Sequence, residues 1–349
     1  MNRHGTRPLA LAIACATLIL LAPGLRAQDE PVIRFGDQVS AEVNRIYERG
    51  LTFLAQSQTQ DGTWGGQPGI TAICLMAFLA RGEDPDFGRY SLQIRRATRN
   101  LITNQDSSTG YLGNRMYDHG FAMLALSEAY GAVDDGSLWT GAGSSKQRSI
   151  GEALELAVRC AITSQEKNQF QAWRYSPDSS DADTSVSGAV LVGLLAARNA
   201  GIEVPDTSID AALDYFKSMT STESGSVGYS GGMGGMGESM NRSSIATLVT
   251  AIGKRKDSDE YKATLAHIKE RIDHQEHSYP FYFRYYMAQA LFQGDPESWA
   301  RWNRETTSIL GGLQRENGSF SGNHGDAYAT GMALLALALN YRFLPIYER

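Results

Sequence analysis

The sequence predicts an all-α fold, an (α/α)6 toroid of about twelve helices in six inner/outer pairs. Helical periodicity runs through most of the 349 residues, and strand alternation is nearly absent. A glycine turn that ends on an aromatic residue recurs between helices. The helices also alternate between charged, amphipathic ones and ones that are apolar on almost every side. Because each repeat buries its apolar surface against its neighbours, such a series can close into a ring.

The recurring turn is clearest at residues 60–66 and 314–320. Each copy has a glutamine, an Asp-Gly or Asn-Gly pair, one further residue and an aromatic residue, with Gln60 and Gln314 taken as equivalent. Weaker copies occur at Gly110-Tyr111 and Gly228-Tyr229. Trp64 and Trp173 belong to such turns and are expected to join adjacent repeats.

The amphipathic helices are expected to form the outer ring, because their charged faces need solvent. The first carries Glu42, Arg45 and Glu48 opposite an apolar stripe. The six outer helices are predicted near residues 39–58, 92–104, 148–165, 207–219, 258–274 and 297–313.

The apolar helices are expected to form the inner ring, because a helix without a polar face must be buried. Four of them open with a polar residue followed by glycine or alanine: Thr71-Ala72, His119-Gly120, Ser187-Gly188 and Thr330-Gly331. The six inner helices are predicted near residues 70–80, 118–130, 184–200, 242–255, 281–293 and 327–341.

Two long connections interrupt the pattern. Residues 134–145 are predicted to be an exposed loop. Residues 225–237 are rich in glycine and methionine; they could cover the mouth of a central cavity or serve as a linker without a role.

The N-terminal residues 1–27 are predicted to be a signal peptide. Arg3 and Arg7 precede an apolar run over residues 9–21, and Ala27 ends a plausible cleavage site. A lipoprotein signal that uses Cys15 is the alternative. A short extension (28–36) and one toroid domain (37–349) would follow, and we expect the mature protein to be periplasmic or extracellular, with no transmembrane segment.

Charge and cysteine content exclude several classes of function. The net charge of −6 comes without a basic stripe, which argues against nucleic acid as a partner. Cys74 and Cys160 lie in apolar helical patterns, where they could be free thiols or a disulfide. No CxxC or HExxH spacing occurs, so we expect neither a metal site nor a cofactor.

The turns and alternating helices resemble the terpenoid cyclase and protein prenyltransferase superfamily, in particular its squalene-cyclase/prenyltransferase repeats. The resemblance covers nearly the whole mature chain. It implies the toroid and a central cavity, but one fold hosts many functions.

The activities of this superfamily depend on residues that the chain lacks. The cyclase motif Asp-x-Asp-Asp-Thr matches residues 180–184, where Ala182 replaces the proton-donating aspartate. The zinc-binding histidine of the prenyltransferases corresponds to Ala329, and no Asp-x-Cys pair occurs. The Cys-Gly-Glu-Gln sequence of complement-type thioester domains, another branch with this fold, is also missing.

The resemblance to such toroids places candidate site residues at the starts of the inner helices. Asp118 and His119 could form a general base with its orienting carboxylate, although a structural histidine is the commoner case. Asp183 and Asp326 each precede a helix-opening polar residue by four positions, and the N-cap is the favoured interpretation for both. The catalytic candidates are Asp118, His119, Asp183, Arg284 and Tyr328. The candidates for ligand binding are Thr71, Ser187, Tyr282, Tyr285, Tyr286, Asp326 and Thr330.

Two hypotheses for function remain open. The first is a toroid that binds an apolar, glycan or protein ligand without chemistry. The second is a divergent enzyme that uses the same cavity, either on isoprenoids or as a polysaccharide lyase or hydrolase. Aromatic walls suit both, because they stabilise carbocations and also stack on sugars.

Overall fold

The structure, a computed structural model, describes residues 39–141, 147–230 and 239–347. All of them belong to one compact unit, Phe35–Arg349; a separate unit comprises Met1–Arg34. The predicted signal peptide (1–27) and extension (28–36) lie outside the described residues, as does most of the predicted 225–237 loop. No helix in the described part is long and apolar enough to cross a membrane.

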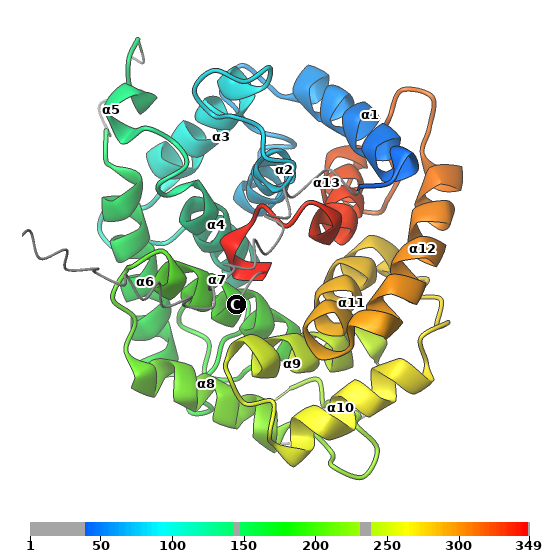
Figure 1. Cartoon of the computed structure of the whole chain (residues 1–349). Helices are drawn as coiled ribbons and strands as arrows, with labels where there is room; N and C mark the ends of the chain where they lie inside the picture. Colours follow the sequence, from blue (N-terminus) through cyan, green and yellow to red (C-terminus); the bar gives the residue numbers. More distant parts are fainter. Residues whose placement is uncertain (1–38, 142–146, 231–238, 348–349) are drawn as a thin grey trace, which may run out of the picture. The chain divides into compact units, whose positions relative to one another are not determined.

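The helices of this unit form two concentric layers (Figure 1). The outer helices are α1 (Ala41–Ser57), α3 (Ser91–Asn104), α6 (Ile150–Lys167), α8 (Asp206–Ser218), α10 (Asp259–Glu270) and α12 (Pro296–Leu313). The inner helices are α2 (Pro68–Ala80), α4 (Met116–Ala129), α7 (Thr184–Asn199), α9 (Met240–Ile252), α11 (Pro280–Gly294) and α13 (Asp326–Leu337).

The inner helices close into a ring. Each contacts the next in the order α2, α4, α7, α9, α11, α13, and α13 contacts α2 again. Each outer helix packs on the inner helix that follows it, and α1 also contacts α12 and α13. The fold is therefore the all-α toroid of six inner/outer pairs that the sequence predicts.

Small residues set the spacing of the inner ring. A Cβ atom on Gly120 of α4 would lie 2.6 Å from the carbonyl carbon of Ala189 in α7. One on Gly331 of α13 would lie 2.7 Å from the Ile73 side chain in α2. Gly120 and Gly331, which each follow a helix-opening polar residue, are thus required by the close approach of two inner helices.

The predicted exposed loop at 134–145 is partly wrong. It contains a thirteenth helix, α5 (Asp135–Leu138), whose Leu138 is buried. The Asp135 carboxylate accepts from the Ile150 amide (2.9 Å), and the Trp139 indole donates to the Arg148 carbonyl (2.9 Å). These contacts dock α5 on the start of α6; residues 142–145 lie outside the described part.

The repeating glutamine of the turn is Gln58 rather than Gln60. Gln60 is exposed, whereas Gln58 and Gln314 each lie four residues before the turn glycine. The Gln58 amide donates to the Gly62 carbonyl (3.1 Å) and to the Gln93 carbonyl in the next outer helix (2.9 Å). Gln105 makes the same pair of bonds, to the Gly110 carbonyl in its own turn and to the Ala153 carbonyl in the next outer helix. Gln165 likewise donates to the Gln171 carbonyl in its turn and to the Ser208 carbonyl in the next outer helix.

The turn tryptophans connect elements within one helix pair. The Trp64 indole donates to the Leu54 carbonyl of α1, and the Trp173 indole donates to the Ala161 carbonyl of α6 (both 2.8 Å). The expectation that the indole groups join adjacent repeats is therefore wrong. The turn glutamines, each of which donates to the next outer helix, join adjacent repeats instead.

The C-terminal segment lies at the C-terminal end of the inner helices. After α13 come two short 3-10 helices, Ala338–Asn340 and Pro345–Tyr347. The Ile346 amide donates to the buried carboxyl group of Glu128, near the end of α4 (3.3 Å), and the second 3-10 helix contacts α7. This segment, red in Figure 1, leaves the opposite, N-terminal end of the ring for the cavity described next.

Candidate ligand-binding cavity

A cavity of about 630 Å³ lies at the N-terminal ends of the inner helices. All six inner helices or the turns before them contribute to its wall. Its lining residues are Gln67, Gly69, Ile70, Ile73, Asn114, Arg115, Tyr117, Asp118, Phe121, Tyr175, Asp183, Ser185, Tyr229, Ser239, Asn241, Arg242, Tyr279, Tyr282, His324 and Tyr328. Six of them are tyrosines, so the wall combines aromatic faces with hydroxyl groups.

Aromatic rings contact one another around the cavity. Tyr282 packs edge-on against Tyr117 and against the buried Tyr286, at 6.4 and 4.8 Å between ring centroids. Tyr279 and His324 are nearly parallel, with centroids 6.0 Å apart, and Tyr279 is 52% exposed. An exposed, oriented ring of this kind offers a flat face to a ligand.

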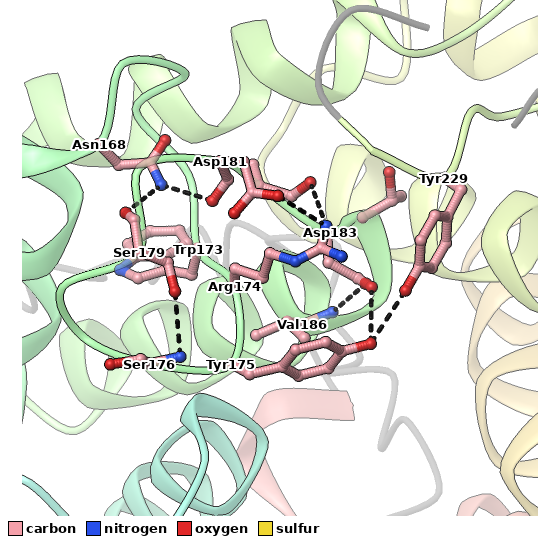
Figure 2. Close-up of polar contacts among 12 residues, drawn as sticks. Asn168, Trp173, Arg174, Tyr175, Ser176, Ser179, Asp181, Asp183, Val186 and Tyr229 are labelled. Carbon is pink, nitrogen blue, oxygen red and sulfur yellow. Dashed lines mark hydrogen bonds and ion pairs between the residues drawn. The ribbon is translucent and has the colours of Figure 1, made fainter. Parts of the chain in front are cut away.

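Asp183 caps α7 and also faces the cavity. Its Oδ1 accepts from the amides of Ser185 (2.8 Å) and Val186 (3.1 Å), as expected for an N-cap. Its Oδ2 accepts from the Tyr175 hydroxyl (3.3 Å), as Figure 2 shows.

The Tyr175 and Tyr229 hydroxyls continue from Asp183 as a chain (Figure 2). They lie 2.9 Å apart. Tyr175 has one proton and donates it to Asp183, so Tyr229 must donate to Tyr175. The bond to Tyr175, burial and the neighbouring Asp183 carboxylate raise the pKa of Tyr229, so the phenol keeps its proton at neutral pH. In this arrangement both hydroxyl protons are used in bonds within the protein, and the remaining lone pairs of the two oxygens are free to act as acceptors.

The chain is held by backbone bonds on both sides. The Thr184 amide donates to the Tyr229 carbonyl (3.0 Å), and the Thr184 hydroxyl donates to the Gly228 carbonyl (2.7 Å). The Met116 amide at the start of α4 donates to the Tyr175 carbonyl (2.9 Å). The starts of two inner helices, α4 and α7, thus fix the two tyrosines.

Asp118 connects α4 to α2 at the cavity wall. Its carboxylate accepts from the amides of Asn114 (3.2 Å), Arg115 (3.1 Å) and Gly69 (3.2 Å). A Cβ atom on Gly69 would lie 2.4 Å from Oδ1, so only glycine admits this contact. Asp118 is therefore a structural acceptor between two inner helices.

Arginines lie on either side of the tyrosine chain. Arg115 is the N-cap residue of α4, and Arg242 is in the first turn of α9; α7 lies between these helices in the ring. The Nε of Arg242 donates to the Val227 carbonyl (2.7 Å), with its guanidinium 5.9 Å from the Tyr229 ring centroid. Arg174 lies over both rings, at 5.3 Å from Tyr175 and 5.7 Å from Tyr229, and forms an ion pair with Asp181 (3.2 Å).

Four of the predicted site residues line the cavity: Asp118, Asp183, Tyr282 and Tyr328. The other eight lie elsewhere. Among the described residues, no three His, Cys, Asp or Glu side chains gather as metal ligands would, and Cys74 and Cys160 are free and buried.

His119 is fully buried behind the wall and does not contact the Asp118 carboxylate. Its Nδ1 accepts from the Leu112 amide (3.0 Å), so Nε2 carries the proton and donates to the Ala157 carbonyl (3.0 Å). Burial lowers the pKa of His119 to about 4. The general-base role proposed from the sequence is therefore wrong, and His119 is a neutral residue that holds the turn.

Thr71, Ser187 and Thr330 occupy the same place in their helices and are also fully buried. Ser187 accepts from the Trp173 amide and Thr330 from the Phe320 amide (both 3.0 Å), so each holds the aromatic residue of its turn. Thr71 donates to the Gln67 carbonyl (3.1 Å). These three residues were expected to face the cavity, but they lie behind its wall.

The remaining candidates point away from the cavity or lie behind its wall. The Arg284 guanidinium donates to the Pro280 carbonyl and lies beside residues of α12. The Asp326 carboxylate pairs with Arg315 (2.7 Å), and Gly325 rather than Asp326 occupies the N-cap of α13. Tyr285 and Tyr286 are buried in mutual contact and support Tyr282 and Phe121.

Sequence reasoning missed the cavity residues Arg115, Tyr117, Tyr175, Tyr229 and Arg242. Tyr175 and Tyr229 lie in the turns before inner helices. Arg115, Tyr117 and Arg242 lie at the cap or in the first turn of an inner helix, one to four positions before the polar residue that opens the apolar run. Position along the inner helix could have identified these residues. Residues of the first helical turn face the cavity, whereas the polar residue that opens the apolar run faces the preceding turn.

Comparison with known proteins agrees with this fold. Residues 43–346 match the family described as a domain of unknown function, DUF6288, and the chain belongs to that family. No curated protein matches the sequence significantly.

Solved structures with low identity share the fold. One is the GH76A α-1,6-mannanase from Salegentibacter sp. HEL1_6 (TM-score 0.59, 10% identity, 85% of this chain and 99% of that chain). A second is a variant of the type II terpene cyclase MstE from Scytonema in complex with geranylgeranyl dihydroxybenzoate (0.59, 14%, 87% and 98%). A third is Dfg5 from Chaetomium thermophilum in complex with glucosamine (0.56, 12%, 86% and 89%).

The fold and the cavity define the class of this protein. It is an α/α toroid whose inner helices direct their N-termini at one cavity, and its structural neighbours include a terpene cyclase and a glycoside hydrolase. At these identities the likeness extends to the fold alone.

Proposed function

We propose that the protein is a glycan-binding toroid that holds its ligand in the cavity at the N-terminal ends of the inner helices. The observation that carries this proposal is the chain from Tyr229 through Tyr175 to Asp183. Its oxygens are hydrogen-bond acceptors toward the cavity, and sugar hydroxyls are donors. The exposed face of Tyr279 supplies the flat apolar surface on which a sugar ring stacks.

The cavity carboxylates support binding rather than hydrolysis. A glycosidase needs one carboxyl group that donates a proton and a second that acts as base or nucleophile. Every hydrogen bond made to Asp118 comes from a backbone amide, and Asp183 accepts from two amides and a tyrosine. Both carboxylates accept hydrogen bonds that hold the cavity wall together, so neither is placed to donate a proton to a ligand.

Isoprenoid binding is the second candidate, because Ile70, Ile73 and Phe121 form an apolar part of the wall. An isoprenoid would leave the hydrogen-bond acceptors of Tyr175 and Tyr229 without partners, and such a loss on desolvation is costly. The polar part of the wall therefore favours the glycan.

A binding screen tests the proposal. The purified protein is titrated calorimetrically with mannose and glucosamine oligosaccharides, a wider glycan panel, and geranylgeraniol. We expect at least one glycan to bind, with Tyr279→Ala and Tyr175→Phe each weakening it about tenfold, roughly 1.4 kcal/mol.

Phe87→Ala is the matched control, because Phe87 is 93% exposed and does not line the cavity. It should leave glycan affinity unchanged. Binding of geranylgeraniol without any glycan would instead support the isoprenoid candidate, and release of a shorter sugar during the titration would show hydrolysis.

A further inference from the structure

We infer that the glycan carries carboxylate groups, and that Arg115 and Arg242 recognise a uronic acid residue on either side of the tyrosine chain. The inference rests on the proposed glycan-binding function and names the class of sugar.

The two arginines stand where helix electrostatics disfavours them. The N-terminus of a helix carries a partial positive charge, so a basic side chain there is destabilising. Arg115 is the N-cap residue of α4, and Arg242 lies in the first turn of α9. Stability alone would favour an acceptor such as Ser or Asp at the N-cap and an acidic residue in the first turn.

Arg115 has no protein partner that would explain its position. Its side chain is exposed, and it makes no hydrogen bond or ion pair with the residues of 39–141, 147–230 and 239–347. Its own backbone amide is satisfied by Asp118. A planar guanidinium at the wall of a cavity offers two parallel donors, the geometry that a carboxylate accepts.

Arg242 is held in a fixed orientation at the same wall. Its Nε bond to the Val227 carbonyl and the nearby Tyr229 ring constrain the guanidinium plane. Burial lowers the pKa of Arg242, and the nearby Asp183 opposes that shift, so the guanidinium remains charged at neutral pH and attracts a further anion.

The cavity carboxylates leave the charge of Arg115 without an ion pair, whereas the Asp183 carboxylate acts electrostatically on Arg242. Asp118 and Asp183 face six donors between them, five of which are backbone amides. Neither forms an ion pair with Arg115 in the described part of the chain. With six helix N-termini around the cavity, the field in its centre favours an anionic group.

Paired ligands provide the test. Oligogalacturonate, oligomannuronate and oligoglucuronate are each compared with the carboxyl-reduced oligosaccharide of the same linkage, by calorimetry with the full protein at low and moderate salt. We expect at least one acid form to bind at least tenfold more tightly than its reduced counterpart, and this preference to shrink as salt rises.

Variants assign the preference to residues. Arg115→Gln should remove most of the preference for the acid form and change binding of the reduced form less than twofold. Arg242→Gln should act in the same direction. Arg159→Gln is the control, since Arg159 is an exposed residue of the outer helix α6, away from the cavity.

The outcomes separate this inference from the proposed function. Equal binding of acid and reduced forms, or equal losses for both in Arg115→Gln, would overturn the uronate inference and leave glycan binding intact. If none of these or the neutral glycans binds the native protein, both proposals fall.

Discussion

The side-chain amide of Gln314, at the end of the last outer helix, donates to the carbonyl of Ile46 in the first outer helix at 2.9 Å. These residues are 268 positions apart in the chain. The same amide donates to the Gly318 carbonyl in its own turn (3.0 Å). The bond that joins neighbouring outer helices elsewhere in the ring is thus also the bond that closes it.

Replacing Gln314 should therefore weaken ring closure. Gln314→Ala removes both bonds from a half-buried site, and we expect the free energy of unfolding to fall by about 1–3 kcal/mol. Urea denaturation measures the change. Gln60→Ala is the matched control, since Gln60 is exposed in the equivalent turn and should change stability by less than about 0.5 kcal/mol. Similar losses for both variants would contradict the assignment of Gln58 as the equivalent of Gln314.

The turn glycine at the same junction should tolerate no side chain. Gly318 has φ of +89°, and a Cβ atom would lie 2.2 Å from the Arg49 carbonyl oxygen of α1. Gly318→Ala should therefore lower the free energy of unfolding by about 3 kcal/mol or more.

Gly312 provides the control for that substitution. It lies in α12 with nothing within 4 Å of its Cβ position, so Gly312→Ala should stabilise the protein by about 0.5–1 kcal/mol. Thermal denaturation of the two variants should thus move in opposite directions, and a destabilised Gly312→Ala would show that the junction is not the cause.

The buried His119 should make the fold sensitive to acid. Its pKa is lowered to about 4 in the folded state, whereas the unfolded chain has a pKa near 6.5. The unfolded state therefore binds more protons between these values, and stability falls as the pH drops from about 6.5 to 4. The full shift corresponds to about 3 kcal/mol.

The variant His119→Gln should be less stable at pH 7, because it cannot keep both ring bonds, but should lose this acid-dependent component. Denaturant titrations at pH 7, 5.5 and 4.5 measure it. An unchanged slope with pH in the variant would assign the acid sensitivity to other groups.

Glu128 should have the opposite effect of pH on stability. Burial raises its pKa to about 8, far above the 4.5 of an unperturbed glutamate. The folded state therefore binds more protons, and stability falls as the pH rises from about 4.5 to 8. Because Glu128 holds the Ile346 amide, the C-terminal segment should be the first part to loosen at high pH.

Hydrogen exchange of the Ile346 amide at pH 6 and 8.5 reports on that segment directly, and Glu128→Gln should remove the pH dependence of its protection. Glu155→Gln, on the exposed face of α6, is the control and should leave it in place. Equal protection at both pH values in the native protein would refute the prediction.

The helices of the ring were predictable because their signals are local. Charged faces marked α1 and α3 as outer helices, and the run after Ser187 marked α7 as an inner one, since burial on all sides admits no charge. The turn glycines were also readable from sequence. The equivalence of Gln58 with Gln314 was missed, because both Gln58 and Gln60 precede Gly62. The matching spacing of four residues to the turn glycine gains its meaning only from the hydrogen bond to the next outer helix.

The site was less predictable, for a physical reason. Residues at the start of an inner helix differ in direction by about 100° per position. Asp118 consequently lines the cavity while His119, the next residue, is sealed behind it with both ring nitrogens bonded. Sequence identified the right turn of the helix without deciding which side chain faces the ligand.

The sequence by itself determined the alternation of outer and inner helices and the absence of the cyclase acid and the prenyltransferase zinc ligands, because periodicity and residue identity are properties of the linear chain. Only the tertiary structure decided which groups meet. Tyr175 and Tyr229 are 54 positions apart, and neither is part of a helix. Their contact exists because the α6–α7 and α8–α9 turns lie side by side at the start of α7, where Thr184 bonds the second turn. Convergence of separate turns leaves no pattern in a sequence.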